Sequence, residues 1–255
     1  MTGESTVRIG LVLPDVLGTY GDNGNAVVLL RRLQWRDMRA TVVPITIDRA
    51  VPESLDVYLL GGGEDAAQLM AARHLAAQPG LRRAAMRGAP MLAVCAGLQL
   101  FGHEFAAADG STERGLGLLD LVSTAGSSRA VGEIVSQPAS RMLVEPLTGF
   151  ENHQGRTALG ADAQPLAHVV RGTGNGDHTD GAVYGRIVAT YLHGPVLARN
   201  PELADLLLTC VTGGPLTPLD IPALRTLRHD RLAASTRRHR SPRSAGRTRR
   251  ETGQT

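Results

Sequence analysis

The residue with the clearest chemical potential in the sequence is Cys95, which follows the apolar run Ala89–Val94 and precedes Ala96 and Gly97. This order predicts a buried strand, a sharp turn at the cysteine, and a helix that continues to Phe105. The strand would fix the sulfur, and the helix N-terminus favours a thiolate. The N–H of Ala96 can point at a developing oxyanion. The pattern equally fits an unreactive cysteine, since free cysteines are often buried.

A cysteine nucleophile needs a base that holds the thiolate and protonates the leaving amine. Of the eight histidines, only His193 follows a predicted strand and precedes a Gly-Pro turn, a placement that matches that of Cys95. His153 and His178 lie in polar loops and remain secondary candidates. The spacing therefore favours His193 as the base and leaves the other two histidines open.

A run of three glycines, Gly61–Gly63, lies between a predicted strand at 56–60 and a predicted helix at 66–77. Such a run exposes several backbone N–H groups at the carboxyl edge of a sheet, where ligands sit in open α/β folds. An oxyanion hole would then draw one donor from the glycines and another from Ala96. Taken alone, the run is more simply explained as a tight turn without a chemical task.

The alternation of strands and helices over the first hundred residues predicts an α/β fold with a mostly parallel open sheet flanked by helices. After Phe105, short strands predominate until a helix predicted at 201–211. The predicted strands are 7–13, 41–47, 56–60, 91–94, 119–123, 131–135, 142–144, 168–170, 182–184 and 186–191. The Gly/Asp/Asn-rich loop at 14–25 lacks a phosphate-binding lysine and the dinucleotide glycine spacing, so we interpret it as a structural or interface loop.

Charge divides the 255 residues into a larger domain, 1–224, and a basic tail, 225–255. All 27 basic residues are arginine; ten of them lie in the tail against two acids, which leaves the tail at +8 and the remainder at −5. This composition predicts a disordered tail. A nucleic-acid-binding arm is an alternative, but charge alone gives only non-specific binding, so a solvated extension is favoured and no specific nucleic acid is expected.

The cysteines, Cys95 and Cys210, offer neither a disulfide framework nor zinc-binding spacing. This usage is typical of a reducing compartment, so a cytoplasmic protein is expected. No apolar run of signal length opens the chain, and none approaches the roughly 20 residues of a membrane span.

Motifs spread in order over residues 7–210 resemble those of class I, triad-type glutamine amidotransferases of the cobyric-acid-synthase-like group. They are GGGED at 61–65, VCAGLQ at 94–99 and YLHGP at 191–195. A narrower likeness, to the GatD-type glutaminase subunits of lipid II isoglutaminyl synthase, comes from LGTYGDNGN at 17–25, GFENHQGRT at 149–157 and GNG at 174–176.

The resemblance implies that Cys95 attacks the side-chain amide of L-glutamine, that His193 assists proton transfer, and that glutamate and ammonia are released. It implies that Arg129 recruits glutamine, and a guanidinium fork suits the carboxylate of that substrate. The backbone N–H groups implied to hold the oxyanion are those near Gly62, Gly63 and Ala96.

Two positions depart from the family pattern. Ala93 replaces a common glycine, which is a small change, and Pro195 stands where the usual His-x-Glu acid would follow His193. The resemblance implies that a MurT-like partner of the Mur-ligase family supplies an aspartate across a heterodimer interface. Weak glutaminase activity is therefore expected from the chain alone and stronger activity from the complex.

The resemblance also assigns the cofactors and the acceptor. ATP and magnesium would belong to the partner, with no cofactor in this chain, and the partner would amidate the D-glutamate of the lipid II stem peptide during peptidoglycan synthesis. Two alternatives remain. One is the amidase subunit of another cobyric-acid-type amidotransferase, which would go with a P-loop nucleotide-binding domain. The other is a non-catalytic regulatory protein on the same fold, with Cys95 unused.

Overall fold

The computed structural model describes residues 6–236, and its centre is a six-stranded sheet in the order β11-β12-β4-β3-β1-β2. All neighbouring pairs are parallel except β11 with β12. The inner strands β3 and β4 are buried throughout, as expected for parallel strands covered on both faces. The strands are β1 (Val7–Val12), β2 (Ala40–Ile45), β3 (Val57–Leu60), β4 (Met91–Val94), β11 (Ala182–Tyr184) and β12 (Ile187–Thr190).

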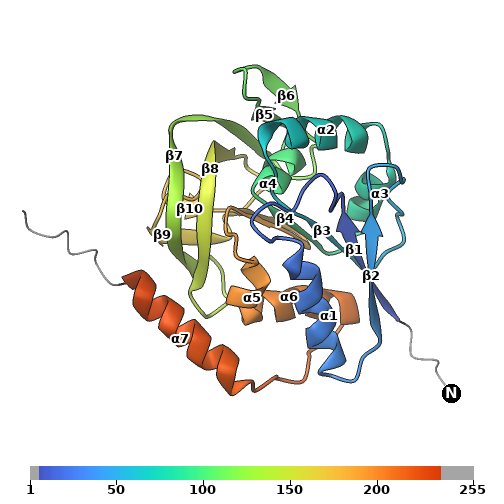
Figure 1. The fold of residues 1–255 in the computed structure, drawn as a ribbon, viewed down its shortest axis with the longest axis vertical. Helices are drawn as coiled ribbons and strands as arrows, with labels where there is room; N and C mark the ends of the chain where they lie inside the picture. The colour runs from blue at the N-terminus through green and yellow to red at the C-terminus, as the bar shows by residue number, and fades with distance from the viewer. Residues whose placement is uncertain (1–5, 237–255) are drawn as a thin grey trace, which may run out of the picture.

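Helices cover both faces of this sheet, with α2, α3 and α4 on one side and α1, α5 and α6 on the other (Figure 1). The predicted mostly parallel open α/β sheet is thereby confirmed. The helices are α1 (Gly24–Gln34), α2 (Asp65–Ala76), α3 (Gly80–Met86), α4 (Ala96–Phe101), α5 (Val196–Arg199) and α6 (Pro201–Thr212). Apolar residues at helical spacing on α1, among them Ala26, Leu29 and Leu33, form its buried face.

A second, largely antiparallel sheet is built on a long pair, β7 (Leu121–Pro138) with β8 (Leu147–Leu159). Its other strands are β5 (Glu104–Ala106), β6 (Thr112–Arg114), β9 (Ala167–Arg171) and β10 (Thr179–Asp180). The β7–β8 register shifts between Ala125 and Ala130, so the intervening residues form a bulge. The predicted strand at 142–144 is wrong: this segment is a loop, in which the Val144 N–H donates to the carboxylate of Glu202.

The C-terminal part of the described chain is helical. Helix α7 (Pro222–Thr236) overlaps the tail for which disorder was predicted, so that prediction is wrong for 225–236. Arg228 attaches the helix to the domain, because its guanidinium donates to the carbonyl oxygens of Arg199 and Pro146. The rest of the predicted tail, 237–255, lies outside the described residues.

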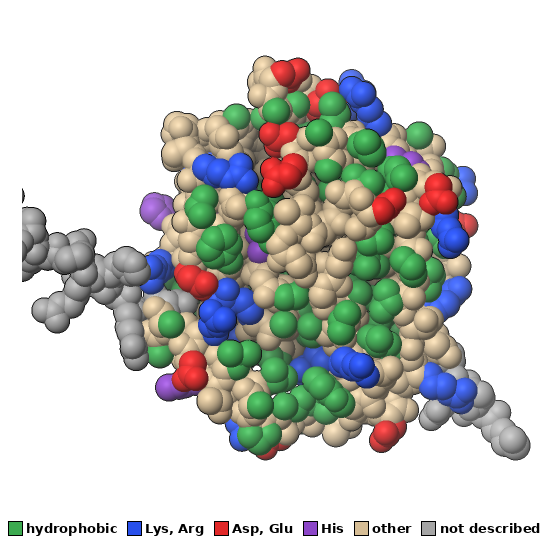
Figure 2. Space-filling view, in the orientation of Figure 1, with side chains coloured by type: hydrophobic (Ala, Val, Ile, Leu, Met, Phe, Trp, Pro, Cys, Tyr) green, Lys and Arg blue, Asp and Glu red, His purple; other side chains and the backbone are tan. Residues whose placement is uncertain are grey.

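The surface view places a concentration of hydrophobic side chains around α1 (Figure 2). Val27 on this helix is 54% exposed. No helix within residues 6–236 has the length and apolar character that a bilayer crossing requires.

Candidate active site

Cys95 occupies the tight junction between β4 and α4. Its backbone has φ 54° and ψ −106°, a conformation that residues with a side chain rarely adopt. The junction is held on both sides, since the Cys95 N–H donates to Thr190 O and the Gln99 N–H donates to Cys95 O. A strained residue fixed between a buried strand and a helix is the geometry of a nucleophile elbow, which presents the side chain at the carboxyl edge of the sheet.

His193 lies just past β12, the strand next to β4, and so reaches the same edge of the sheet. Its backbone pairs with Phe150 of β8 through two hydrogen bonds, of 2.9 and 3.1 Å, which join the two sheets at this point. Asp180 secures the approach, because its carboxylate accepts from the Thr190 hydroxyl at 2.5 Å and the Tyr191 N–H at 3.2 Å. The ring of His193 is buried and therefore fixed in direction.

An aspartate of this chain orients that ring. His193 Nδ1 donates to Asp22 Oδ2 at 2.9 Å, and both side chains are buried. The resemblance implied that a partner supplies the aspartate beside His193, whereas in this structure the ring already pairs with the carboxylate of Asp22 from its own chain. Asp22 comes from the loop before α1, which we had interpreted as a structural or interface loop.

Gly62 marks the point where the three side chains meet. A Cβ placed on this glycine would lie 2.9 Å from His193 Cε1, 3.2 Å from Cys95 Cβ and 3.2 Å from Asp22 Oδ2. No larger residue fits between them without displacing at least one. The structure thus brings together Cys95 and His193, as the spacing predicted, and adds Asp22.

The electrostatics of the group favour a protonated imidazole. Burial opposes the charged form of His193, but the hydrogen bond to Asp22 and the neighbouring Cys95 outweigh burial and raise the pKa of His193 to about 10, from an ordinary value of 6.5. Nε2 is buried and finds no hydrogen-bond partner among the described residues, so it is the ring nitrogen left for the thiol. An imidazolium beside a cysteine sulfur is an arrangement that activates cysteine nucleophiles.

The predicted oxyanion donors fall into two groups. The Gly62 N–H donates to Asp22 Oδ2 at 2.9 Å, so Gly62 holds the acid rather than facing a ligand. Gly63 has an N–H with no acceptor in the described chain, and Ala96 is the first residue of α4, where an N–H has no acceptor in its own helix. Both residues line the pocket beside Cys95, so these two remain the candidate donors.

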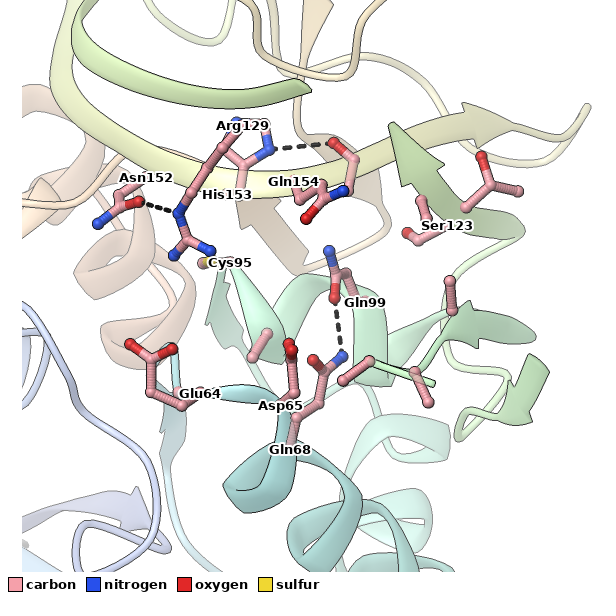
Figure 3. A pocket seen from close by; sticks show the side chains of 18 of the residues that line it. Glu64, Asp65, Gln68, Cys95, Gln99, Ser123, Arg129, Asn152, His153 and Gln154 are labelled. Carbon is pink, nitrogen blue, oxygen red and sulfur yellow. Dashed lines mark hydrogen bonds between the residues drawn. The ribbon is translucent and has the colours of Figure 1, made fainter. Parts of the chain in front are cut away.

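A pocket of about 180 Å³ opens in front of Cys95, between the two sheets. Arg129, from the β7 bulge, reaches into it with its guanidinium above Cys95 (Figure 3). Arg129 Nε donates to Asn152 Oδ1 at 2.6 Å. The bulge itself is pinned, because Gln154 Nε2 donates to Gly126 O at 3.0 Å and Arg156 Nη2 donates to Ser128 O at 3.2 Å. The Arg129 guanidinium is therefore placed to bind a small anionic group that enters the pocket near the Cys95 thiol.

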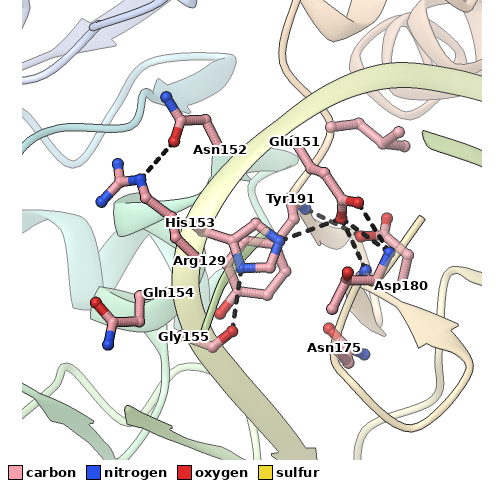
Figure 4. A network of polar contacts seen from close by, with 12 residues as sticks. Arg129, Glu151, Asn152, His153, Gln154, Gly155, Asn175, Asp180 and Tyr191 are labelled. Atoms are coloured by element: carbon pink, nitrogen blue, oxygen red, sulfur yellow. Dashed lines mark hydrogen bonds and ion pairs between the residues drawn. The ribbon is translucent and has the colours of Figure 1, made fainter. Parts of the chain in front are cut away.

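A second buried network supports the wall of the pocket (Figure 4). His153 stacks on Tyr191 with ring centroids 3.8 Å apart and lies 3.4 Å from the Glu151 carboxylate. The same carboxylate accepts the N–H groups of Thr173 and Gly174, at 2.8 and 3.0 Å. His153, a secondary candidate base, is thus built into the second sheet.

Asp22 is the main residue that the sequence reasoning missed. Its only local signal is an aspartate within a glycine- and asparagine-rich loop, whereas the bond that defines its role spans 171 residues. Asn152, Tyr20 and Glu64 were also not singled out as site residues. No group of three or more His, Cys, Asp or Glu within residues 6–236 is arranged to bind a metal ion.

The chain is similar to known glutamine amidotransferases. Residues 8–201 match the CobB/CobQ-like glutamine amidotransferase domain. The GatD subunit of the glutamine-hydrolysing lipid II isoglutaminyl synthase of Staphylococcus aureus is 35% identical over 82% of this chain and 87% of its own length. The corresponding subunit of Streptococcus pneumoniae is 34% identical over 80% of this chain and 79% of its own length.

A solved glutamine amidotransferase structure has the same fold, with a TM-score of 0.56 at 18% identity, over 80% of this chain and 98% of the other. The site described above lies within the matched residues, from Asp22 to His193. The chain belongs to the CobB/CobQ-like glutamine amidotransferase family.

Proposed function

We propose that this chain is a glutaminase subunit that hydrolyses L-glutamine to glutamate and ammonia. The ammonia passes to an ATP-dependent, Mur-ligase-like partner, which amidates the D-glutamate of the lipid II stem peptide. The observation that carries the hydrolytic part is the buried array of Cys95, His193 and Asp22 around Gly62, at the base of a pocket that holds Arg129.

In the first half of the reaction, the Cys95 sulfur attacks the side-chain carbonyl carbon of glutamine. The N–H groups of Gly63 and Ala96 donate hydrogen bonds to the developing oxyanion. His193 gives its proton to the departing nitrogen, so ammonia leaves and a γ-glutamyl thioester remains. Asp22 keeps Nδ1 protonated and thereby directs Nε2 at the reacting atoms.

In the second half, neutral His193 removes a proton from water, which attacks the thioester carbon. The tetrahedral intermediate collapses, glutamate leaves, and the thiolate and imidazolium are restored. Arg129 holds the α-carboxylate of the substrate through charge-assisted hydrogen bonds during both halves.

The lipid II assignment is supported by the two bacterial relatives that carry the name of lipid II isoglutaminyl synthase subunits. A partner also needs a surface on which to dock. Tyr20 and Val27 are 40% and 54% exposed, and hydrophobic side chains gather in the same region around α1 (Figure 2). Because α1 begins against Pro195, two residues from His193, a partner bound there would lie close to the site of ammonia release.

The first test is hydrolysis by the full chain alone. Because Asp22 completes the array within this chain, we expect ammonia release without a partner, rather than the weak activity that a partner-supplied acid would leave to the chain alone. Cys95→Ala should abolish release. If the wild-type chain releases no ammonia alone but does so with a partner, Asp22 is insufficient and the partner completes the site.

The second test separates ammonia production from its use. A complex of the chain with a Mur-ligase-like partner, ATP, magnesium and lipid II should amidate D-glutamate with either glutamine or ammonium chloride as nitrogen source. With Cys95→Ala, the glutamine-dependent reaction should disappear and the ammonium-dependent reaction should persist. If Cys95→Ala abolished the ammonium-dependent reaction as well, the assignment of glutamine hydrolysis to this chain and of amidation to the partner would be contradicted. If the wild-type complex showed neither reaction, the lipid II acceptor would be contradicted.

A further inference from the structure

We propose that Glu64 binds the α-ammonium group of glutamine and so restricts the pocket to substrates with a free amino group. The inference rests on the proposed function, since it names the second charged contact of the same substrate. Glutamine carries a carboxylate and an ammonium group on one carbon. A pocket that recognises both groups must place an anion close to the cation that binds the carboxylate.

The structure has this pairing of charges. Glu64 and Arg129 both line the pocket that holds Cys95. Figure 3 shows the Glu64 carboxylate and the Arg129 guanidinium facing one another from opposite walls, both on the Cys95 side of the pocket. A zwitterion bound between them would meet a complementary charge at each end, and its side-chain amide would remain free to reach the thiol.

A chain of hydrogen bonds fixes the two charged groups relative to each other. Arg129 Nε donates to Asn152 Oδ1 at 2.6 Å, and Asn152 Nδ2 donates to the Tyr20 hydroxyl at 2.7 Å. The Tyr20 hydroxyl in turn donates to Glu64 Oε1 at 3.3 Å. Two neutral side chains, Asn152 and Tyr20, therefore link the guanidinium to the carboxylate and position them relative to each other.

The Glu64 carboxylate is also not used by its own helix. Glu64 occupies the N-cap position of α2 with extended backbone, φ −73° and ψ 160°, yet its side chain makes no capping hydrogen bond. The residues that commonly cap a helix from this position are Ser, Thr, Asp and Asn, and glutamate is not among them. In this chain the carboxylate instead turns toward Tyr20 and the pocket, where Oε2 finds no donor among the described residues.

The neighbouring residue, Asp65, supplies a matched control. It carries the same charge, lines the same pocket and differs by one position. As the first residue of α2 it interacts favourably with the helix N-terminus. It takes no part in the hydrogen-bond chain that leads to Arg129.

The experiment compares two substrates on the full chain: L-glutamine and 4-carbamoylbutanoate, which is glutamine without its amino group. For Glu64→Gln we expect kcat/KM with glutamine to fall about 10- to 100-fold, the range for a charge-assisted hydrogen bond. Because 4-carbamoylbutanoate has no ammonium group to lose, its kcat/KM should be nearly unchanged. The preference of the wild-type chain for glutamine should therefore collapse in this variant.

Two further variants test the assignment. Tyr20→Phe removes the hydroxyl that donates to Glu64 but keeps the Glu64 carboxylate. The preference for glutamine over 4-carbamoylbutanoate should therefore fall by a smaller factor than in Glu64→Gln. Asp65→Asn should leave it unchanged. The proposal is overturned if Glu64→Gln lowers kcat/KM equally for both substrates. It is also overturned if Asp65→Asn, rather than Glu64→Gln, removes the preference for glutamine over 4-carbamoylbutanoate.

A binding measurement distinguishes failure of this inference from failure of the proposed function. L-glutamine should protect Cys95 of the wild-type chain from alkylation by iodoacetamide, and Glu64→Gln should need about 10- to 100-fold more glutamine for the same protection. Protection and hydrolysis that are identical in wild type and Glu64→Gln overturn the role of Glu64 alone. A wild-type chain that neither hydrolyses glutamine nor is protected by it overturns both proposals.

Discussion

Two buried histidines, each beside a buried carboxylate, lie in different regions of the molecule. At the edge of the parallel sheet, His193 donates from Nδ1 to Asp22 and keeps Nε2 without a partner among the described residues. In the second sheet, His153 lies 3.4 Å from Glu151 through Nε2, and its Nδ1 lies 3.0 Å from Gly155 O (Figure 4). The His193 ring thus keeps one nitrogen available for proton transfer, whereas both ring nitrogens of His153 contact other groups.

The comparison shows that the two buried histidine–carboxylate pairs differ in whether the ring keeps a nitrogen without a hydrogen-bond partner among the described residues. The two carboxylates also differ in the groups that they bind. Asp22 bonds His193 and the Gly62 N–H at the thiol, whereas Glu151 closes the loop of Thr173 and Gly174 onto the sheet. The first pair is placed for reaction and the second holds the wall of the pocket.

The largest expected effect separates the two histidines. His193→Ala should lower glutamine hydrolysis by about 10³-fold or more, because both proton transfers pass through this ring. His153→Ala should retain hydrolysis and lower the free energy of unfolding by roughly 2–4 kcal/mol, because it removes a buried ring stacked on Tyr191. Steady-state kinetics and urea denaturation measure the two quantities. Loss of hydrolysis in a folded His153→Ala protein would break the comparison.

Asp22→Asn should lower kcat by about 10²- to 10⁴-fold, because the imidazolium loses its carboxylate and the ring its orientation. The pH profile gives an independent readout. His193 holds its proton up to about pH 10 in the wild type, so its contribution to stability is complete below pH 6.5 and is lost as the pH rises through 10. In the variant the alkaline limb of kcat/KM should move to lower pH, and an unmoved limb would contradict the role of Asp22.

Gly62→Ala should lower hydrolysis by about 10²-fold, because its methyl group would displace His193 or Cys95. The same overpacking should cost about 1–3 kcal/mol of stability. Gly214→Ala is the matched control, since a methyl group there meets nothing within 4 Å. Kinetics and thermal unfolding of both variants check the contrast, which fails if the two alanines behave alike.

Glu151→Gln should have the smallest effect on hydrolysis and cost about 1–3 kcal/mol of stability at neutral pH. Burial would raise the pKa of Glu151, but hydrogen bonds from His153, Gly174 and Thr173 bring it below its ordinary value of 4.5. The stability from its charged form is thus present above pH 4.5 and lost as the pH falls through the lower native pKa. The difference in free energy of unfolding between wild type and Glu151→Gln should therefore become smaller in acid. Denaturation curves from pH 3 to 7 measure this difference, and a constant difference would contradict the role given to Glu151.

The sequence was sufficient to predict the parallel sheet and the tight turn at Cys95, because the relevant signals are local. Continuous apolar runs such as 91–94 identify strands buried on both faces, and a cysteine followed by small residues identifies the turn. The second sheet was harder to predict. A single strand, β7, was predicted as two short ones because the bulge residues 126–129 are small or polar and interrupt the apolar alternation.

The acid could not be found from local pattern. Asp22 lies in a loop with no periodicity, and its partner is remote in the chain, so only the folded arrangement of β1, β3 and β12 brings them together. Helix α7 was missed for a different reason. Its many arginines lower the mean hydropathy, but leucine, alanine and arginine are good helix formers, and Arg228 ties the helix to backbone carbonyls.

The order of Asp22, Cys95 and His193 along the chain has a consequence for synthesis. The elbow cysteine leaves the ribosome well before β12, the strand inserted between β4 and β11 that carries the histidine to the edge. A nascent chain that ends before this strand lacks His193, however well its first strands have formed. Completion of the sheet between β4 and β11 and the arrival of the imidazole beside the thiol are thus a single step of folding.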